Sequence, residues 1–315
     1  MSILEGLANV ITNPVFYFTV ITVTAPILFA TLGCSVAQKA DVTNMGMEGI
    51  MMISSFVGVV VSHFTNSTWL GLLASVIAGT LMGLFVAYFA LVLKVNIILV
   101  GIALNLIGPG ITAFFCYVLS GDRSTTAAWQ TGRLPSIDIP GVKDIPVLGD
   151  IISGQPVLVY IAFILVAVCS FFLYKTRTGL RIRAVGENPN AASSVGVSVN
   201  KTKTIALAIS GMLGGFGGAF LSTCFLSYFT IAITSGRGFV ALAACTMGGA
   251  TPLGSLLTSL LFGFFYGFAN FSRALGIPDQ LLTMLPYVAV IVGLVIYSVV
   301  RQRNELKKLK RGSGK

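Results

Sequence analysis

A succession of apolar stretches, most of them about as long as a membrane is thick, constrains this chain more than any other feature. A helix needs about 20 apolar residues to cross the hydrocarbon core, and fewer where other helices shield it. Charged residues make up only 10% of the 315 residues, against roughly 25% in a soluble domain. The sequence therefore predicts an all-α integral membrane protein of the cell membrane, a polytopic bundle of about nine transmembrane helices. The stretches lie near 14–33, 46–64, 68–92, 97–119, 156–174, 204–222, 238–250, 256–271 and 280–300.

Two of these stretches are short. The stretches 238–250 and 256–271 are separated by the turn sequence Ala-Thr-Pro-Leu-Gly at 250–254. Broken or half helices are tolerated at membrane depth only where they pack inside protein or line a cavity. We therefore expect half helices beside a solute pathway. The alternative is eight crossings with a re-entrant piece elsewhere.

The basic residues predict the orientation. Thirteen of the 20 Lys and Arg residues fall in segments 175–203 and 301–315, each of which holds one acid, whereas loop 120–155 holds three bases and four acids. Basic loops stay in the cytoplasm. We expect one transmembrane domain over 1–300 with an outside N-terminus, an outer loop at 120–155, a cytoplasmic loop at 175–203 and a basic cytoplasmic tail at 301–315. The net charge of +10 therefore reflects orientation rather than a nucleic-acid partner.

Glycines recur four residues apart within the apolar stretches. Small residues at this spacing let helix backbones approach closely, which replaces the hydrophobic drive that lipid does not supply. We predict tight packing within one bundle; the alternative is a helix that slides or bends during transport. The pairs are Gly79 and Gly83, Gly211 and Gly215, Gly214 and Gly218, and Gly263 and Gly267.

The cytoplasmic loop contains the signals of a short helix. After a basic turn, Asn188 is a good N-cap, Pro189 suits the first helical position, and Gly196 suits the residue after the helix end. The predicted helix covers about 189–195. Seven residues are too few for a helix that is stable alone in water, so it must dock on its own bundle or on a partner. Its apolar face would consist of Ala191, Ala192 and Val195.

Three sequence blocks resemble a known family. The run T-R-T-G-L-R-I-R-A-V-G-E-N-P-N-A-A at 176–192 resembles the cytoplasmic coupling segment of permeases of the ribose and simple-sugar class of ABC importers, most closely the shorter permease of nucleoside systems with Bmp-type lipoproteins. D-V-T-N-M-G-M-E-G at 41–49 resembles its G-V-x-N-I-G-x-E-G pattern, with Asp for Gly at 41 and Met for Ile at 45. G-R-G-F-V-A-L-A-A at 236–244, followed by G-G-A-T-P-L-G at 248–254, resembles a third block.

The resemblance implies a permease subunit that passes nucleosides or simple sugars into the cytoplasm by alternating access. Its implied partners are an ABC ATPase, a second homologous permease and an extracellular substrate-binding lipoprotein that docks on the outer loop. The short cytoplasmic helix would lodge in a cleft of the ATPase. No G-x-x-x-x-G-K-[ST] sequence occurs, so we expect ATP and Mg on the ATPase, and neither cofactor nor enzyme activity in this chain. The coupling residues carried over are Gly179, Arg181, Arg183, Gly186, Glu187, Asn188, Pro189, Ala191 and Ala192.

Polar groups at membrane depth are expensive and are the candidates for the solute pathway. A nucleoside needs amide and charged partners for its polar edges and aromatic faces for stacking. Glu48 has an alternative role at the interface, where it would cap its helix or pair with Lys39. The motif Gly-Pro-Gly at 108–110 predicts a break in the stretch 97–119. The pathway candidates are Asn44, Glu48, Asn96, Asn105, Arg237, Phe239, Tyr266 and Asn270.

Two other classes of function compete. An ion-coupled secondary transporter usually carries an acidic or histidine relay inside its spans, and here Glu48 and His63 are nearly the only candidates. A membrane enzyme would need a nucleophile with its base, or a metal cluster. The five cysteines lie in apolar runs without ligand spacing, so we expect no metal site. Dependence on a partner ATPase distinguishes the importer from both.

Overall fold

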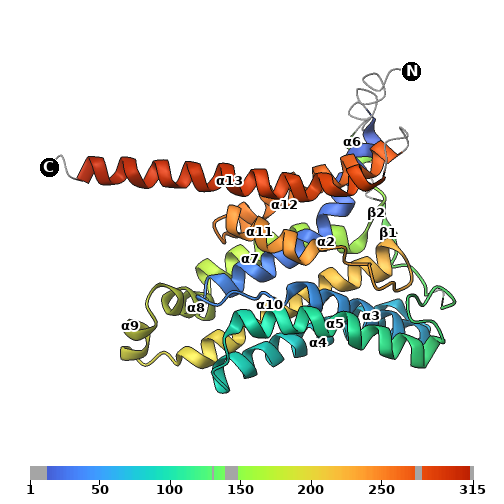
Figure 1. Cartoon of the computed structure of the whole chain (residues 1–315), viewed down its shortest axis with the longest axis horizontal. Helices are drawn as coiled ribbons and strands as arrows, with labels where there is room; N and C mark the ends of the chain where they lie inside the picture. The colour runs from blue at the N-terminus through green and yellow to red at the C-terminus, as the bar shows by residue number, and fades with distance from the viewer. Residues whose placement is uncertain (1–12, 130, 139–147, 274–278, 313–315) are drawn as a thin grey trace.

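The computed structural model describes residues 13–129, 131–138, 148–273 and 279–312. These residues form a bundle of long helices with one two-stranded antiparallel sheet, in which Ser136 pairs with Pro156 and Ile137 with Gln155 (Figure 1). The long helices are α2 (Pro14–Gln38), α3 (Met47–Thr65), α4 (Thr68–Ala87), α5 (Ile97–Ser120), α7 (Val157–Lys175), α10 (Val199–Phe220), α12 (Pro252–Ser272) and α13 (Asp279–Gly312). The shorter elements are η1 (Tyr88–Val92), β1 (Ser136–Ile137), α6 (Leu148–Ile152), β2 (Gln155–Pro156), α8 (Arg177–Glu187), α9 (Pro189–Ser194), η2 (Leu221–Phe225) and α11 (Arg237–Met247).

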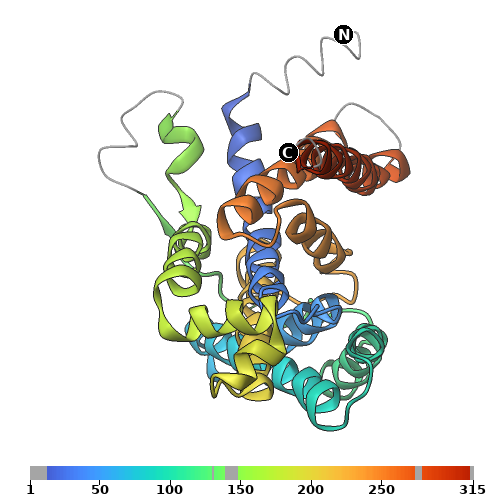
Figure 2. The same cartoon turned by 90° about the vertical axis from the view of Figure 1, so that its left-hand side faces the viewer.

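The two ends of the bundle carry different loops. The sheet and α6 lie at one end, the outer end, and α8 and α9 lie at the other, the cytoplasmic end (Figures 1 and 2). The basic character of α8 assigns its end to the cytoplasm. Helix α2 begins at the outer end, and α13 runs past the bundle on the cytoplasmic side (Figure 1). With that assignment, α2 begins outside and α13 ends in the cytoplasm.

Within the described residues, eight helices are long and apolar enough to cross a membrane. The predicted stretch 238–250 is not a full span, because α11 has only 11 residues. The non-helical segment 226–236 precedes it and starts at the outer end, where Thr131 hydrogen-bonds to the carbonyl of Ser227. The last turns of α11 reach the cytoplasmic end of α2, where Cys245 Sγ lies 3.0 Å from Gln38 Oε1. A half helix and a segment of turns together make this crossing. The other expected half helix, at 256–271, is wrong, because α12 has 21 residues and is long enough to span the membrane.

Helix α10 lies at the centre and packs against α2, α3 and α4. Its glycines face two different helices. A Cβ atom on Gly211 would lie 2.8 Å from the Cα of Gly83, and one on Gly79 would lie 2.7 Å from the Cα of Gly215, so α4 and α10 touch backbone to backbone. Gly218 makes the equivalent approach to α3 at Met51. The predicted tight packing through spaced glycines is confirmed.

The predicted break in α5 is wrong. Helix α5 continues from Ile97 to Ser120 with Pro109 inside it. The Thr112 hydroxyl donates to the carbonyls of Gly108, at 2.8 Å, and Pro109, at 3.2 Å. Proline removes one backbone donor, the one that would bond the Asn105 carbonyl, but membrane helices tolerate such a loss without breaking.

The outer loop is tied to the segment that enters α11. Thr126 and Phe229 exchange two hydrogen bonds, from the Thr126 N–H to the Phe229 carbonyl at 2.9 Å and from the Phe229 N–H to the Thr126 hydroxyl at 3.0 Å. Arg133 Nε donates to the Ser227 hydroxyl at 2.6 Å. These contacts connect the outer surface to the non-helical half of the broken crossing.

Candidate solute pathway and coupling surface

Glu48 holds the N-terminus of α11. Its two carboxylate oxygens accept from two backbone N–H groups, Gly236 at 2.8 Å and Gly238 at 2.7 Å. A carboxylate in this position also meets the positive end of the α11 dipole. A Cβ on Gly238 would lie 2.6 Å from the Glu48 Cα, so only glycine permits this approach. Glu48 therefore caps another helix; neither its expected cap on its own helix nor the pairing with Lys39 is present.

Asn44 and Asn105 hold the start of α3 in place. The Asn105 amide oxygen accepts from the Gly49 N–H at 2.8 Å, and its nitrogen donates to the Met45 carbonyl at 2.7 Å. Buried Asn44 donates to the Ser210 hydroxyl of α10 at 3.0 Å and accepts from the Gly46 N–H at 3.2 Å. Both amides are occupied by contacts within the chain, which gives them a structural role.

Asn96 lies away from the other pathway candidates. It is exposed at the start of α5, where its side chain caps the helix by accepting from the Ile98 N–H at 2.9 Å. The turn that precedes it connects the cytoplasmic end of η1 to α5. Lys94, in this turn, has a positive φ of 55°. The structure therefore places Asn96 as a helix cap near the cytoplasmic end.

Three of the candidates meet in one cavity. Arg237 from α11 and Tyr266 and Asn270 from α12 line a space of about 110 Å³, which α13 closes with Pro286 and Tyr287. The Arg237 guanidinium lies over the Tyr266 ring, 5.3 Å from its centroid. The cavity also reaches Arg273, near the outer ends of α12 and α13. It lies on the side from which an imported solute would arrive.

Two buried polar atoms in this cavity have no partner within the described part of the chain. These are Arg237 Nε and the Tyr266 hydroxyl, on side chains that are only 8% and 9% exposed. A buried donor left without a partner costs about 1–3 kcal/mol. The rest of the Arg237 guanidinium is fixed in place, because its Nη1 donates to the carbonyls of Ile233, at 3.0 Å, and Thr234, at 3.3 Å.

Sequence reasoning missed Tyr287. Its hydroxyl donates to the Ser235 carbonyl at 2.7 Å and so fastens α13 to the loop before α11. One aromatic residue in an apolar stretch carries no signal that separates it from packing residues. Phe239, in contrast, was predicted, and it lies on the open side of α11 with 53% of its surface exposed.

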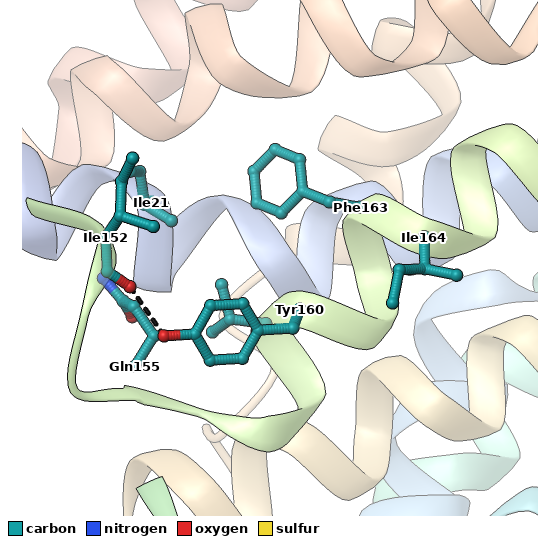
Figure 3. A pocket seen from close by; sticks show the side chains of 7 residues that line it. Ile21, Ile152, Gln155, Tyr160, Phe163 and Ile164 are labelled. Atoms are coloured by element: carbon teal, nitrogen blue, oxygen red, sulfur yellow. Dashed lines mark hydrogen bonds between the residues drawn. The ribbon is translucent and has the colours of Figure 1, made fainter. Parts of the chain in front are cut away.

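A larger cavity elsewhere does not suit a polar solute. It measures about 380 Å³ and lies between α2 and α7, lined by Ile21, Phe163 and Ile164 with Gln155 and Tyr160 at one end (Figure 3). The chain itself uses the polar groups there. Tyr160 donates to the Ile152 carbonyl at 2.6 Å, and Gln155 Nε2 donates to the Phe18 carbonyl at 3.0 Å.

The coupling surface starts with a helix that we did not predict. Residues 177–187 form α8 instead of the expected basic turn. The Thr176 hydroxyl caps it by accepting from the Gly179 N–H at 3.1 Å, and Gly179, Ile182 and Val185 are buried on one face. This spacing of three residues was the signal that could have revealed it.

The carried-over residues of α8 face in different directions. Gly179 and Gly186 pack against the bundle, on the carbonyls of Phe172 and Lys39. Arg183 lies over the ring of Tyr174, 4.8 Å from its centroid. Two carried-over residues of α8 are exposed at the cytoplasmic end, Arg181 and Glu187.

Helix α9 begins as predicted and ends one residue earlier, at Ser194. The Asn188 side chain accepts from the N–H groups of Asn190 and Ala191, both at 3.1 Å. Pro189 occupies the first turn, and Gly196 has the left-handed φ of +84°. Of the predicted apolar face, only Ala192 is buried in the chain; Ala191 and Val195 are exposed. The exposed side faces the cytoplasm.

The sequence departure at position 41 has a structural explanation. Asp41 stands where the family pattern has Gly, and its φ is +56°. Glycine adopts this left-handed conformation freely, and Asp is among the other residues that tolerate it best.

Comparisons with known proteins agree with this arrangement. Residues 16–300 match the family described as branched-chain amino acid transport system / permease component. The chain is 35% identical over 285 residues to the guanosine ABC transporter permease protein NupQ of Bacillus subtilis, covering 86% of this chain and 88% of the relative. It is 32% identical over 308 residues to the nucleoside ABC transporter permease protein NupC of Lactococcus lactis, covering 94% of both.

A third relative is named for a different substrate. The putative glucose ABC transporter permease protein TsgC13 of Haloferax volcanii is 32% identical over 75% of this chain and 71% of the relative. The predicted family and fold are confirmed, since the match covers nearly every crossing and eight described helices suit a multi-pass protein of the cell membrane. The chain belongs to this permease family and is a membrane-spanning permease subunit of an ABC transporter.

Proposed function

We propose that this chain is the permease subunit of an ATP-driven importer of nucleosides. The observation that carries the proposal is the similarity to two permeases named for guanosine and for nucleosides, over 86% and 94% of this chain. The polar cavity at Arg237 and Tyr266 supports it, because a polar neutral solute needs donors at membrane depth. Solute would pass from the outer end along α11 to the cytoplasm by alternating access.

The proposal includes the division of work between subunits. ATP and Mg bind to a separate ATPase, and this chain carries neither cofactor nor enzyme activity. A second, homologous permease completes the path. A substrate-binding lipoprotein delivers solute to the outer loop 120–155, and residues 1–300 act as one transmembrane domain with the basic tail 301–315 in the cytoplasm.

The coupling step rests on α9. Its exposed residues Ala191 and Val195 offer a small apolar surface that fits a cleft of the ATPase closely. Exposed Arg181 flanks this surface and suits acidic groups or carbonyl ends on that partner. Because α8 packs on α7 and α10, a push on α9 reaches the bundle directly.

Uptake of labelled guanosine and glucose tests the function. The chain is expressed with its partner permease, ATPase and lipoprotein in cells that lack other nucleoside uptake. We expect guanosine uptake that needs both this chain and an ATPase competent in hydrolysis. Uptake of glucose alone would overturn the nucleoside assignment. Transport by the reconstituted permease without ATPase, under an ion gradient, would favour the secondary transporter instead.

Ala191→Arg tests the coupling surface. A long charged side chain cannot enter a close-fitting cleft, and losing a central interface contact costs about 2 kcal/mol or more, or about 30-fold. We expect guanosine uptake to fall by at least that factor while the amount of protein in the membrane is unchanged. Asn200→Arg, an equally exposed site at the start of α10, is the matched control and should retain uptake. Normal uptake by Ala191→Arg would contradict the coupling role.

A further inference from the structure

The cavity between α11, α12 and α13 contains more donor capacity than the chain uses. Arg237 Nε and the Tyr266 hydroxyl make no hydrogen bond within the described residues, yet both side chains line the same 110 Å³ space. Arg237 cannot turn away, because its Nη1 is bound to the Ile233 and Thr234 carbonyls. Two aromatic rings also flank the guanidinium, Tyr266 at 5.3 Å and Phe225 at 5.8 Å.

A carboxylate close to Arg237 offsets the charge of its guanidinium. Glu48 binds the backbone of Gly236 and Gly238, the residues on either side of Arg237. A ligand that gains from Arg237 Nε and the Tyr266 hydroxyl supplies an acceptor oxygen, because both groups are donors.

The geometry points to a recognition site in which Arg237 Nε and the Tyr266 hydroxyl bind an acceptor oxygen of the transported solute. This inference rests on the proposed function, and it makes the ligand the sugar hydroxyl or base carbonyl of a nucleoside. A volume of 110 Å³ is well below the roughly 300 Å³ of a pocket that encloses a whole small molecule. The site therefore receives one edge of the nucleoside.

The position of the site explains what it does in import. Tyr266 and Asn270 lie in the last third of α12, and Arg273 follows its last residue, towards the outer end. A nucleoside that arrives from outside therefore meets this site before it passes along the rest of α11. Because α13 closes the cavity through Tyr287, which is bonded to the Ser235 carbonyl, binding and the position of α13 are linked.

Tyr266→Phe in the complete transporter is the decisive experiment, because it removes one oxygen atom that has no hydrogen-bond partner among the described residues. Since no described group bonds this hydroxyl, its removal should leave the stability of the protein unchanged or raise it. We expect normal membrane levels and thermal stability, with the KM for inosine raised about tenfold, the effect of one lost hydrogen bond. An unchanged KM at unchanged stability would overturn the inference.

Three labelled substrates distinguish the two sources of the oxygen. Wild-type and Tyr266→Phe transporters are compared on inosine, 2′-deoxyinosine and purine riboside, which lacks the base carbonyl. A KM increase that spares 2′-deoxyinosine assigns the contact to the 2′-hydroxyl, and one that spares purine riboside assigns it to the base carbonyl. An equal increase for all three assigns it to a sugar hydroxyl that they share.

Two tyrosine variants serve as matched controls. Tyr287→Phe breaks the bond to the Ser235 carbonyl, and Tyr160→Phe breaks bonds to the Ile137 and Ile152 carbonyls far from the cavity. Both should lower thermal stability, and Tyr160→Phe should do so without changing the KM for any of the substrates. Tyr287 lines the cavity, so Tyr287→Phe is a control for stability alone. If the wild type moves no nucleoside, the proposed function fails, and the Tyr266 comparison is repeated with glucose and 2-deoxyglucose. An unchanged glucose KM would then overturn the site as well.

Discussion

The contact between α4 and α10 and the contact among α11, α12 and α13 are built in opposite ways. In the first, glycine meets glycine and the backbones touch, as at Gly79 with Gly215. In the second, bulky Arg237, Tyr266 and Tyr287 surround a cavity, and two buried donors there have no partner among the described residues. Close-packed interiors transmit strain and tolerate little change, whereas polar groups without a partner are available to bind a ligand. We interpret the first contact as scaffold and the second as the place where solute passes.

The largest expected effect comes from filling the scaffold contact. In Gly211→Leu the new side chain would meet the backbone of Gly83 within 2.8 Å. We expect a loss of about 3 kcal/mol or more, because the backbones cannot separate without breaking the packing around them. The measurement is the amount and melting temperature of detergent-extracted protein.

Gly110→Leu is the matched control for this variant. It is a helical glycine on the exposed side of α5, and a Cβ added there meets nothing within 4 Å. It should reach the membrane and melt as the wild type does. Equal damage by both variants would mean that glycine content, rather than the α4–α10 contact, limits stability.

Glu48→Gln should have an intermediate effect and tests the link between the two regions, since Glu48 lies on α3 and caps α11. The neutral amide offers one acceptor oxygen where the carboxylate offers two, and it loses the charge assistance of the bonds to Gly236 and Gly238. We expect the bonds that hold the α11 terminus to contribute about 2 kcal/mol less to stability. Uptake should be roughly tenfold slower, with membrane levels retained. Unchanged uptake and stability would show that α11 holds its position without the cap.

The smallest effect is expected for Asp41→Asn. Asp41 lies in the loop 39–46, which leads into α3 and Glu48. Asp41 pairs with Lys203 at 3.6 Å, but its side chain is 67% exposed. An exposed ion pair contributes about 0–1 kcal/mol, and Asn tolerates the positive φ well. Melting temperature and uptake should match the wild type closely. A large loss of uptake or of melting temperature would show that the whole 39–46 loop, rather than the Glu48 cap alone, holds α11 in place.

The apolar stretches predicted the long helices because each carries its own signal, about 20 apolar residues in a row. The cap at Asn188 and the terminator at Gly196 were equally local, so the start and end of α9 were predictable to within a residue. Helix α8 was missed because glycine and basic residues predominate in its sequence, and only Ile182 and Val185 mark the apolar face that packs on the bundle.

The pathway residues show where sequence reasoning reaches its limit. A list of polar groups at membrane depth does not separate those that bind the chain from those that face a cavity. Asn44 and Asn105 are bound within the chain, whereas Arg237 and Tyr266 each retain an atom that no described residue bonds. The difference depends on partners more than 50 residues away in the sequence, as with Asn105 and Gly49.

By itself, the sequence determined that the chain spans a membrane repeatedly, which end faces the cytoplasm, and which small helix projects there. These properties follow from local composition, since lipid selects apolar length and the membrane sorts basic loops. Only the tertiary structure decided that the seventh crossing is part helix and part irregular turns, with the helix capped by Glu48. It also decided which donors remain unpaired, because helices distant in sequence meet at angles and distances that packing alone sets.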